Sequence, residues 1–252
     1  VDVGSNAPVS DYPFTFAFWV HPAALIAAYA GGMFDEGSAD KGYGTRLYAD
    51  GSVVTRARNG TDSTASTVAN SLHLGGWHCV LSVFTSDTSR ATYVDGQIAA
   101  TDTGNIDFNT AVDNLIWGAE KDNAVGSLFK GRMSQAAMWD VSLTQANAQS
   151  MWELGPTGNW LTSFSSNILV YHAMGNHNEI GGRPADTAAA VYDRSGNARD
   201  GVTAGSMYAP HKGKLITPAG TVKHTTDRKN FGSSAIYFDG DSDYLTIPYS
   251  PD

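Results

Sequence analysis

The 252-residue chain is acidic and rich in glycine, with 25 Asp and Glu residues against 16 Lys and Arg, a formal net charge of −9 and 27 glycines. This balance leaves no basic stripe for a nucleic acid or an anionic membrane, so we expect neither as a partner. No apolar run reaches the length of a membrane span, and the single cysteine, Cys79, stands in an apolar segment, where we expect a core residue and not a reactive thiol.

The first predicted strand covers residues 13–20, PFTFAFWV. Its alternate positions place Phe14, Phe16 and Phe18 on one face, as expected for a strand buried on at least one side. A hairpin is predicted over residues 44–57, turning on Asp50-Gly51, and residues 59–72 are small and polar, which is typical of an exposed loop or an edge strand.

Residues 73–102 form the most regular stretch of the chain. Two runs with a period of two, one opened by Trp77 and one ending at Val94, predict two strands, and Gln97 begins a third. Asp95-Gly96 lies between the last two and supplies the two positive-φ positions of a tight type I′ turn. We therefore predict a three-stranded antiparallel meander.

Two more strands and a helix follow the meander. The strands are predicted over residues 114–119 and 129–140, and the helix over residues 145–154. Thr144 can cap the start of this helix, Gly155 is suited to its C-terminal turn, and Pro156 cannot continue it. Ala148, Met151 and Trp152 share one face of the helix, so we expect them in the core, as we do Trp77, Trp117 and Trp139.

The segment GWHCVLSVFTSDTSRATYVDGQIAA resembles the laminin-G-like, concanavalin-A-like jelly-roll domains, in which a Trp-His strand precedes a Tyr-Val-Asp-Gly hairpin. The aromatic strand before His21-Pro22, the strands over 114–119 and 129–140, and the closing helix are similar to that family as well. The resemblance implies an all-β fold, a two-sheet antiparallel jelly-roll sandwich with one short helix near residues 145–154.

Residues 168–252 resemble the first strands of the same family, so the family's elements occur here in circularly permuted order. We divide the chain into the main part of the sandwich (1–155), a linker (156–167) and the N-terminal-type strands (168–252). Each half lacks the strands that would cover its core, so we expect the halves to pair within one chain or between neighbouring chains. The alternative is that the sequence is an excerpt of a tandem array. Residues 1–8 and 245–252 are similar to each other, as if one strand were represented twice.

The turn DGDSD at residues 239–243 is the densest group of oxygen ligands, with Asp239, Asp241 and Asp243 at alternate positions. Carboxylate and carbonyl oxygens are the ligands that Ca²⁺ prefers, so we consider a structural Ca²⁺ site here. The alternative is that these carboxylates only accept hydrogen bonds from turn amides. The resemblance implies an additional acidic pair in the strand over 129–140, but Ser134-Gln135 stands there.

The sequence gives little support for catalysis. A glycosidase needs two carboxylic acids across the sugar, and the four glutamates follow none of the patterns of the glucanases that share this fold. We therefore expect no enzyme. The aromatic residues in loop-like surroundings, where a sugar ring could stack, are Tyr12, Trp160, Tyr208 and Tyr249.

These observations favour a non-catalytic surface module that binds glycans, or that decorates a virion, such as a phage tail or capsid, or an extracellular assembly. The alternatives are a purely structural subunit that assembles by strand exchange and a degenerate glycoside hydrolase. We expect the protein to lie outside the cell or on a virion surface. Its partners are then a glycan or other subunits of the same assembly, and we expect a homo-oligomer.

Overall fold

The computed structural model describes residues 8–35, 37, 40–121, 125–174, 190–204, 236–238 and 244–246. Two short helices and many short strands make up this part of the chain. In chain order the elements are β1 (Phe14–Pro22), β2 (Ala28–Phe34), β3 (Lys41–Leu47), β4 (Val53–Asn59), β5 (Asp62–Ser66), β6 (His78–Ser86), β7 (Ser89–Val94), β8 (Gln97–Asp102), β9 (Asn114–Trp117), β10 (Glu120–Lys121), β11 (Val125–Gly126), β12 (Gly131–Trp139), α1 (Gln145–Leu154), α2 (Leu161–Phe164), β13 (Ile168–His172), β14 (Ala190–Val191), β15 (Gly201–Ala204), β16 (Ile236–Phe238) and β17 (Tyr244–Thr246).

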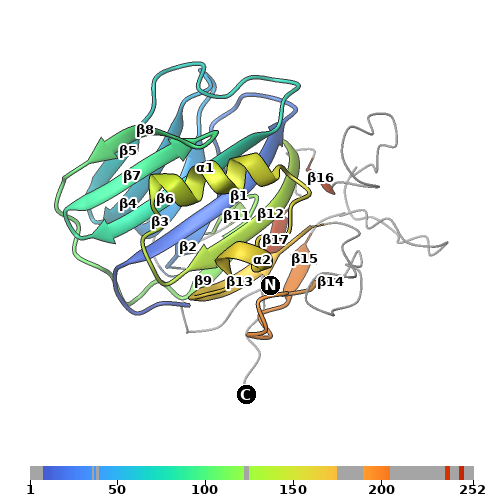
Figure 1. Cartoon of the computed structure of the whole chain (residues 1–252). Coiled ribbons are helices and arrows are strands. Elements are labelled where there is room, and N and C mark those ends of the chain that lie inside the picture. Colours follow the sequence, from blue (N-terminus) through green and yellow to red (C-terminus); the bar gives the residue numbers. More distant parts are fainter. Residues whose placement is uncertain are drawn as a thin grey trace.

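Two antiparallel sheets lie face to face (Figure 1). The seven-stranded sheet has the order β13-β12-β1-β6-β7-β8, with β16 also paired to β12. The eight-stranded sheet has the order β14-β15-β17-β9-β2-β3-β4-β5. This arrangement confirms the predicted jelly-roll sandwich. No helix in the described ranges is long and apolar enough to span a membrane.

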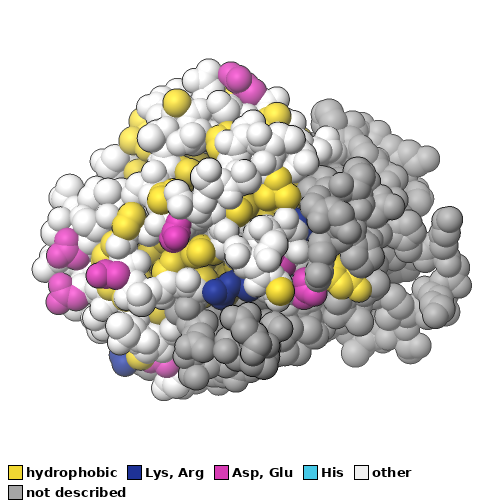
Figure 2. Space-filling model, turned by 60° about the horizontal axis from the view of Figure 1, so that its bottom comes forward, with side chains coloured by type: hydrophobic (Ala, Val, Ile, Leu, Met, Phe, Trp, Pro, Cys, Tyr) yellow, Lys and Arg dark blue, Asp and Glu magenta, His cyan; other side chains and the backbone are white. Residues whose placement is uncertain are grey.

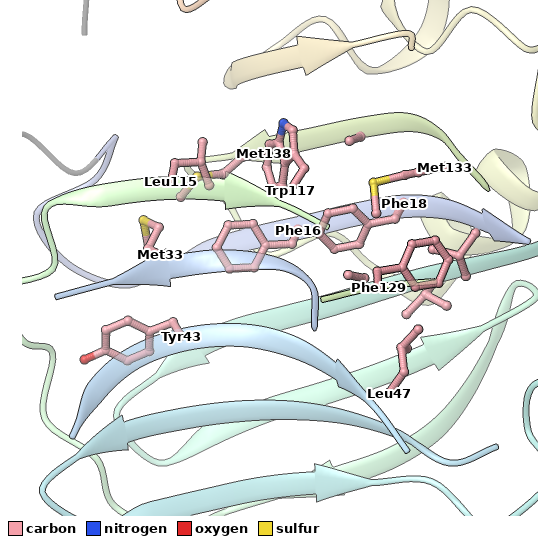
Figure 3. Close-up of a cluster of buried hydrophobic side chains, with 14 of the residues drawn as sticks. Phe16, Phe18, Met33, Tyr43, Leu47, Leu115, Trp117, Phe129, Met133 and Met138 are labelled. Atoms are coloured by element: carbon pink, nitrogen blue, oxygen red, sulfur yellow. The ribbon is translucent and has the colours of Figure 1, made fainter. Parts of the chain in front are cut away.

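The core between the sheets is built from the alternating apolar positions of the strands. Phe14, Phe16 and Phe18 of β1 are fully buried there, as their spacing predicted. Figure 3 shows Phe16 and Phe18 on one side of this core, with Met33 of β2 and Trp117 of β9 contributed by the facing sheet. The ring centroids of Phe18 and Trp117 are 5.3 Å apart in an edge-to-face arrangement, which suits the charge distribution of aromatic rings.

The other face of the seven-stranded sheet is covered by the helices. Figure 1 shows α1 lying across this face. Thr144 caps α1 and forms a reciprocal capping box with Asn147, while Gly155 ends the helix with a φ of 74°, so the predicted helix is confirmed. Ala148 and Met151 of α1 are buried in a second apolar cluster with Trp139 of β12.

The strands of the C-terminal part pair with strands of the N-terminal part within the same chain. In the seven-stranded sheet, β13 and β16 both pair with β12, and in the eight-stranded sheet β17 lies between β15 and β9. The segment 156–167, expected as a linker, contains α2 and supplies Trp160 and Phe164 to the cluster under the helices.

Candidate functional site

The outer face of the eight-stranded sheet, turned away from the core, carries a group of aromatic and cationic side chains. The register places Tyr29, Arg46, Val54 and Ser66 in one row across β2, β3, β4 and β5. Because successive residues of a strand point to opposite faces, and Leu47 next to Arg46 is in the core, this row lies on the outer face.

Glycines of β3 make room on this face for two large rings. A Cβ at Gly44 would lie 3.0 Å from the ring of Tyr29, and a Cβ at Gly42 would lie 2.7 Å from the ring of Phe34. Both rings therefore lie directly over the backbone of β3, and both are almost fully buried. Because Gly42 and Gly44 have no side chains, the two aromatic rings can pack directly on the backbone of β3.

A closed ion-pair network lies beside these rings. Arg56 Nη2 is 2.8 Å from Asp62 Oδ2, Arg56 Nη1 is 3.6 Å from Glu120 Oε1, and Arg56 also donates a hydrogen bond to the Tyr29 hydroxyl. Burial raises the pKa of Tyr29 to about 12, so its hydroxyl stays protonated at neutral pH. Arg58 is 2.7 Å from Asp40, so it too has a carboxylate partner.

Arg46 differs from these arginines because no carboxylate lies within ion-pair distance of it among the described residues. Its guanidinium carbon is 5.6 Å from the ring centroid of Tyr29 and 4.9 Å from that of Tyr48, which are cation–π distances. The Nε of Arg46 is buried and has no hydrogen-bond partner in the described part of the chain. Arg46 and Tyr48 are each half-buried, so a ligand can reach both. We call Tyr29, Arg46 and Tyr48 the Arg46 platform.

The chemistry of the Arg46 platform is that of a binding surface. The Tyr48 ring offers an apolar face, and the terminal nitrogens of Arg46 offer donors to an acceptor group. Within the described residues, no three His, Cys, Asp or Glu side chains lie close enough together to hold a metal ion.

The chain as a whole carries a formal net charge of −9. Figure 2 shows one face of the molecule, on which Asp and Glu side chains lie at several separate places and hydrophobic side chains are visible between the polar ones.

Tyr12, one of the predicted ligand contacts, is half-buried at one end of the sandwich. Its hydroxyl donates a 2.8 Å hydrogen bond to Ile106 O, and its ring stacks on Phe14 at a centroid distance of 5.7 Å. An open depression beside Tyr12 is also lined by Asp11 and Asp140. A ligand contact at Tyr12 therefore stays a prediction.

Trp160 is not in an exposed loop, which corrects its prediction as a ligand contact. It is fully buried between Trp139 and Tyr171, at centroid distances of 5.9 and 6.1 Å, because the segment leading into α2 folds back onto the sheet. No ring face is left for a sugar. The remaining predicted site residues, Tyr208, Tyr249, Asp239, Asp241 and Asp243, lie outside the described residues.

Ser134 and Gln135, which occupy the place of the family's acidic pair, have a structural role. Both side chains donate hydrogen bonds to Pro156 O, at 2.7 and 3.2 Å, and both are buried. They hold the segment that follows α1 against β12.

Trp152 was expected in the core, and this expectation was wrong. Its side chain is 45% exposed, whereas Ala148 and Met151 of the same helix are buried. Arg46 and Tyr48 were not among the predicted ligand contacts, because they lie in the predicted hairpin and the predicted contacts were aromatic residues in loops. The sequence does contain a signal for them. Arg46 and Tyr48 are two residues apart in a predicted strand, so both lie on the face opposite Leu47.

A comparison with known protein families identifies a family that matches this chain. The Laminin_G_3 family model, described as the concanavalin A-like lectin/glucanases superfamily, matches residues 1–149, more than half of the chain. A search of curated proteins finds no match.

Two solved structures share the fold at low sequence identity. The CBM40 domain of the Ruminococcus gnavus IT-sialidase, bound to alpha2,3 sialyllactose, has a TM-score of 0.50 and 16% identity, with 56% of this chain and 83% of that chain covered. A Bacteroides ovatus protein described as a candidate carbohydrate binding protein has a TM-score of 0.53 and 16% identity, with 75% of this chain and 51% of that chain covered. By its fold and by the family match, the chain belongs to the concanavalin A-like lectin/glucanase superfamily.

Proposed function

We propose that this protein is a non-catalytic carbohydrate-binding module that binds a glycan on the outer face of the eight-stranded sheet. The observation that carries the proposal is the half-buried Tyr48 ring beside Arg46, whose guanidinium has no carboxylate partner among the described residues. An aromatic ring can stack on the apolar face of a sugar, and an unpaired guanidinium can donate hydrogen bonds to the oxygens at the sugar's edge.

The structural neighbours support the same class of ligand. The Ruminococcus gnavus domain was solved with sialyllactose, and the Bacteroides ovatus protein is described as a candidate carbohydrate binding protein. At 16% identity these likenesses concern the fold, so the ligand of this chain is argued from the Arg46 platform itself.

The carboxylates next to the Arg46 platform support a non-catalytic role. Asp62 and Glu120 both form ion pairs with Arg56, at 2.8 and 3.6 Å. A glycosidase needs one carboxylic acid to protonate the leaving oxygen and a second carboxylate to act as base or nucleophile. Two carboxylates engaged by one guanidinium are suited to holding the sheet surface in place, and not to this proton transfer.

We further propose that the module acts outside the cell, in an extracellular assembly or on a virion surface, as a homo-oligomer. Several copies on one assembly would raise the apparent affinity for a repeating glycan without any new contact. Sedimentation equilibrium of the full chain checks the oligomer: a single species at the 26.7 kDa monomer mass up to high concentration would contradict it.

The glycan proposal is tested by binding to a panel of oligosaccharides, with calorimetry on those that bind. We expect Tyr48→Ala to weaken binding by about tenfold or more, because it removes the stacking ring and one side of the Arg46 cation–π contact. The matched control is Trp152→Ala, which removes an exposed aromatic side chain from α1, on the other sheet. We expect this variant to bind as the parent does.

Tyr12→Ala distinguishes the second candidate surface. If Tyr12→Ala loses binding while Tyr48→Ala keeps it, the site lies in the depression beside Asp11 and not on the sheet face. The absence of any binding by the parent protein, over neutral and acidic glycans alike, would overturn the proposed function.

A further inference from the structure

The cations on the outer face of the eight-stranded sheet are neutralised locally, with one exception. On β4, Arg56 lies 2.8 Å from Asp62 and Arg58 lies 2.7 Å from Asp40. Lys41, at the start of β3, lies 3.4 Å from Asp35, so it has a carboxylate partner as well. Arg46 has only the two tyrosine rings as partners for its guanidinium, within the ranges that the structure describes. Among the described residues, this face therefore carries one full positive charge without a counter-charge.

The surroundings of Arg46 make this charge available to a ligand. The guanidinium lies within cation–π distance of both the Tyr29 and the Tyr48 ring, and its Nε is buried. Its two terminal nitrogens donate no hydrogen bond to a described residue, and the side chain as a whole is half-buried, so we take these nitrogens as the donors available to a ligand. The planar guanidinium can donate two parallel hydrogen bonds to a carboxylate or sulfate, a geometry that a single sugar hydroxyl does not match.

The nearest acidic turn does not compete for Arg46. Asp50 follows Tyr48 by two residues, and its Oδ1 accepts hydrogen bonds from Ser52 N at 2.9 Å and Ser52 Oγ at 2.7 Å. The net charge of −9 is spread over the whole chain. At physiological ionic strength, exposed charges farther apart than about 8 Å are largely screened from each other, so local charges decide which ligand binds.

We propose that the glycan bound by the Arg46 platform carries an anionic group, a carboxylate or a sulfate, which pairs with Arg46. This inference rests on the proposed function and adds the charge class of the ligand. A neutral sugar would stack on Tyr48 in the same way but would leave the half-buried cation uncompensated. An anionic group gains the charge-assisted hydrogen bonds in addition.

The test compares anionic oligosaccharides with neutral counterparts of the same backbone. Oligogalacturonate against its methyl ester examines carboxylates, and a sulfated oligosaccharide against its desulfated form examines sulfates. We expect at least one of the two anionic ligands to bind the parent protein about tenfold tighter than its neutral partner. We also expect the difference to shrink as sodium chloride is raised.

Variants test whether the preference for the anionic ligand depends on Arg46. Arg46→Gln should remove this preference, so that the anionic ligand and its neutral partner bind alike. Arg132→Gln, which removes the same charge from β12 of the other sheet, should leave it unchanged. Thermal melting checks that each variant is folded, and Arg46→Lys, which keeps the charge without the planar fork, should retain part of the preference even if the Gln variant unfolds.

Three further outcomes test this inference and the proposed function separately. If the parent binds both members of each pair equally and Tyr48→Ala loses both, glycan binding stands and the anionic preference is wrong. The assignment to Arg46 is also wrong if Arg132→Gln removes the preference as fully as Arg46→Gln, because net charge would then explain it. If the parent binds no member of either pair and no other glycan, the proposed function itself fails.

Discussion

At the scale of single residues, the core between the sheets is bridged by buried hydroxyl groups. Thr45 and Thr55 of the eight-stranded sheet each donate a 2.7 Å hydrogen bond to Ser82 Oγ of the seven-stranded sheet. Thr92 donates a 2.6 Å hydrogen bond to Ala65 O across the same space. All of these hydroxyl-bearing residues are fully buried. An unpaired hydroxyl in such surroundings is destabilising, so these groups depend on each other.

Ser82→Ala should lower the free energy of unfolding by about 1–3 kcal/mol, because it removes the acceptor of the Thr45 hydroxyl and leaves the Thr55 hydroxyl only the longer 3.3 Å hydrogen bond to Ala91 O. Urea denaturation measures this change. Ser66→Ala, on the exposed outer side of β5, is the matched control and should change stability by less than about 0.5 kcal/mol.

Adding Thr45→Val to Ser82→Ala should recover part of the loss, because valine fills the same space without a donor. Equal stabilities of the parent and the Ser82→Ala variant would show that the bridging hydroxyls do not specify the contact between the sheets.

The Asp239, Asp241 and Asp243 turn carries a prediction about metal. If this turn binds Ca²⁺, calcium at one hundred times its Kd should raise the free energy of unfolding by about 2.7 kcal/mol. Thermal melting with calcium and with a chelator measures the effect, and Asp241→Ala should abolish it. Identical melting temperatures with calcium and with the chelator would contradict a Ca²⁺ site at these residues.

At the scale of elements, the Asp95-Gly96 turn joins the central meander to α1. Asp95 and Gly96 have φ values of 51° and 79°, and Val94 pairs with Gln97, as predicted for a two-residue type I′ turn. The Asp95 carboxylate accepts hydrogen bonds from His78 Nδ1 and Cys79 N, both at 2.8 Å, so the turn is tied to β6.

Gly96→Ala should destabilise the protein more than Gly60→Ala, although both glycines have a positive φ, of 79° and 75°. Both substitutions force an L-residue into the left-handed region, at about 1–2 kcal/mol. A Cβ at Gly96 would also lie 2.9 Å from Gln149 Cα of α1, whereas a Cβ at Gly60 meets nothing within 4 Å.

The difference in urea midpoint between these two variants isolates the contact of the hairpin with α1. If the two alanine variants are equally stable, α1 can move away from the hairpin without loss of stability, and its packing against the hairpin contributes little to the free energy of unfolding.

The contact between α1 and the hairpin also explains why burial of Trp152 was wrongly predicted from the sequence. The helical period puts Trp152 on the face of Ala148 and Met151, and the period alone predicts burial. In the structure Trp152 lies over Gly96, at the end of the meander, and it remains 45% exposed. A helix pattern gives the direction of a side chain but not the extent of the surface beneath it.

At the scale of the whole molecule, local patterns predicted the elements, the family resemblance implied their assembly into a sandwich, and neither predicted the site. The meander, the capped helix and the aromatic strand each depend on neighbouring residues, so the sequence alone indicated them. The Arg46 platform depends on the pairing of β2 with β3, including a register shift between Tyr29 and Gly31. The irregular pairing decides that Tyr29 is the ring of β2 that meets Arg46, and no local pattern of the sequence shows it, whereas the two-residue spacing of Arg46 and Tyr48 is visible in the sequence. Trp160 was misplaced for a related reason, because its burial depends on how the chain folds back after α1.

We propose that residues 168–252 complete the sandwich and are not a separate unit, which a truncation tests. In the structure β12 is paired by β13, and β9 by β17, so a chain ending at Gly155 would leave both strands with an unpaired edge. It would also lose Val170 from the core and Tyr171 from the cluster under the helices, both fully buried.

Each large apolar side chain of this kind contributes about 1.5–3 kcal/mol when buried, against a typical net stability of about 5–15 kcal/mol for a whole domain. We therefore expect the chain ending at Gly155 to show no cooperative thermal transition, while the full chain melts cooperatively. Calorimetry on both proteins makes the comparison. A soluble truncated protein with a sharp, reversible transition would show that residues 1–155 close their own core. The strands after residue 168 would then be free to complete another domain.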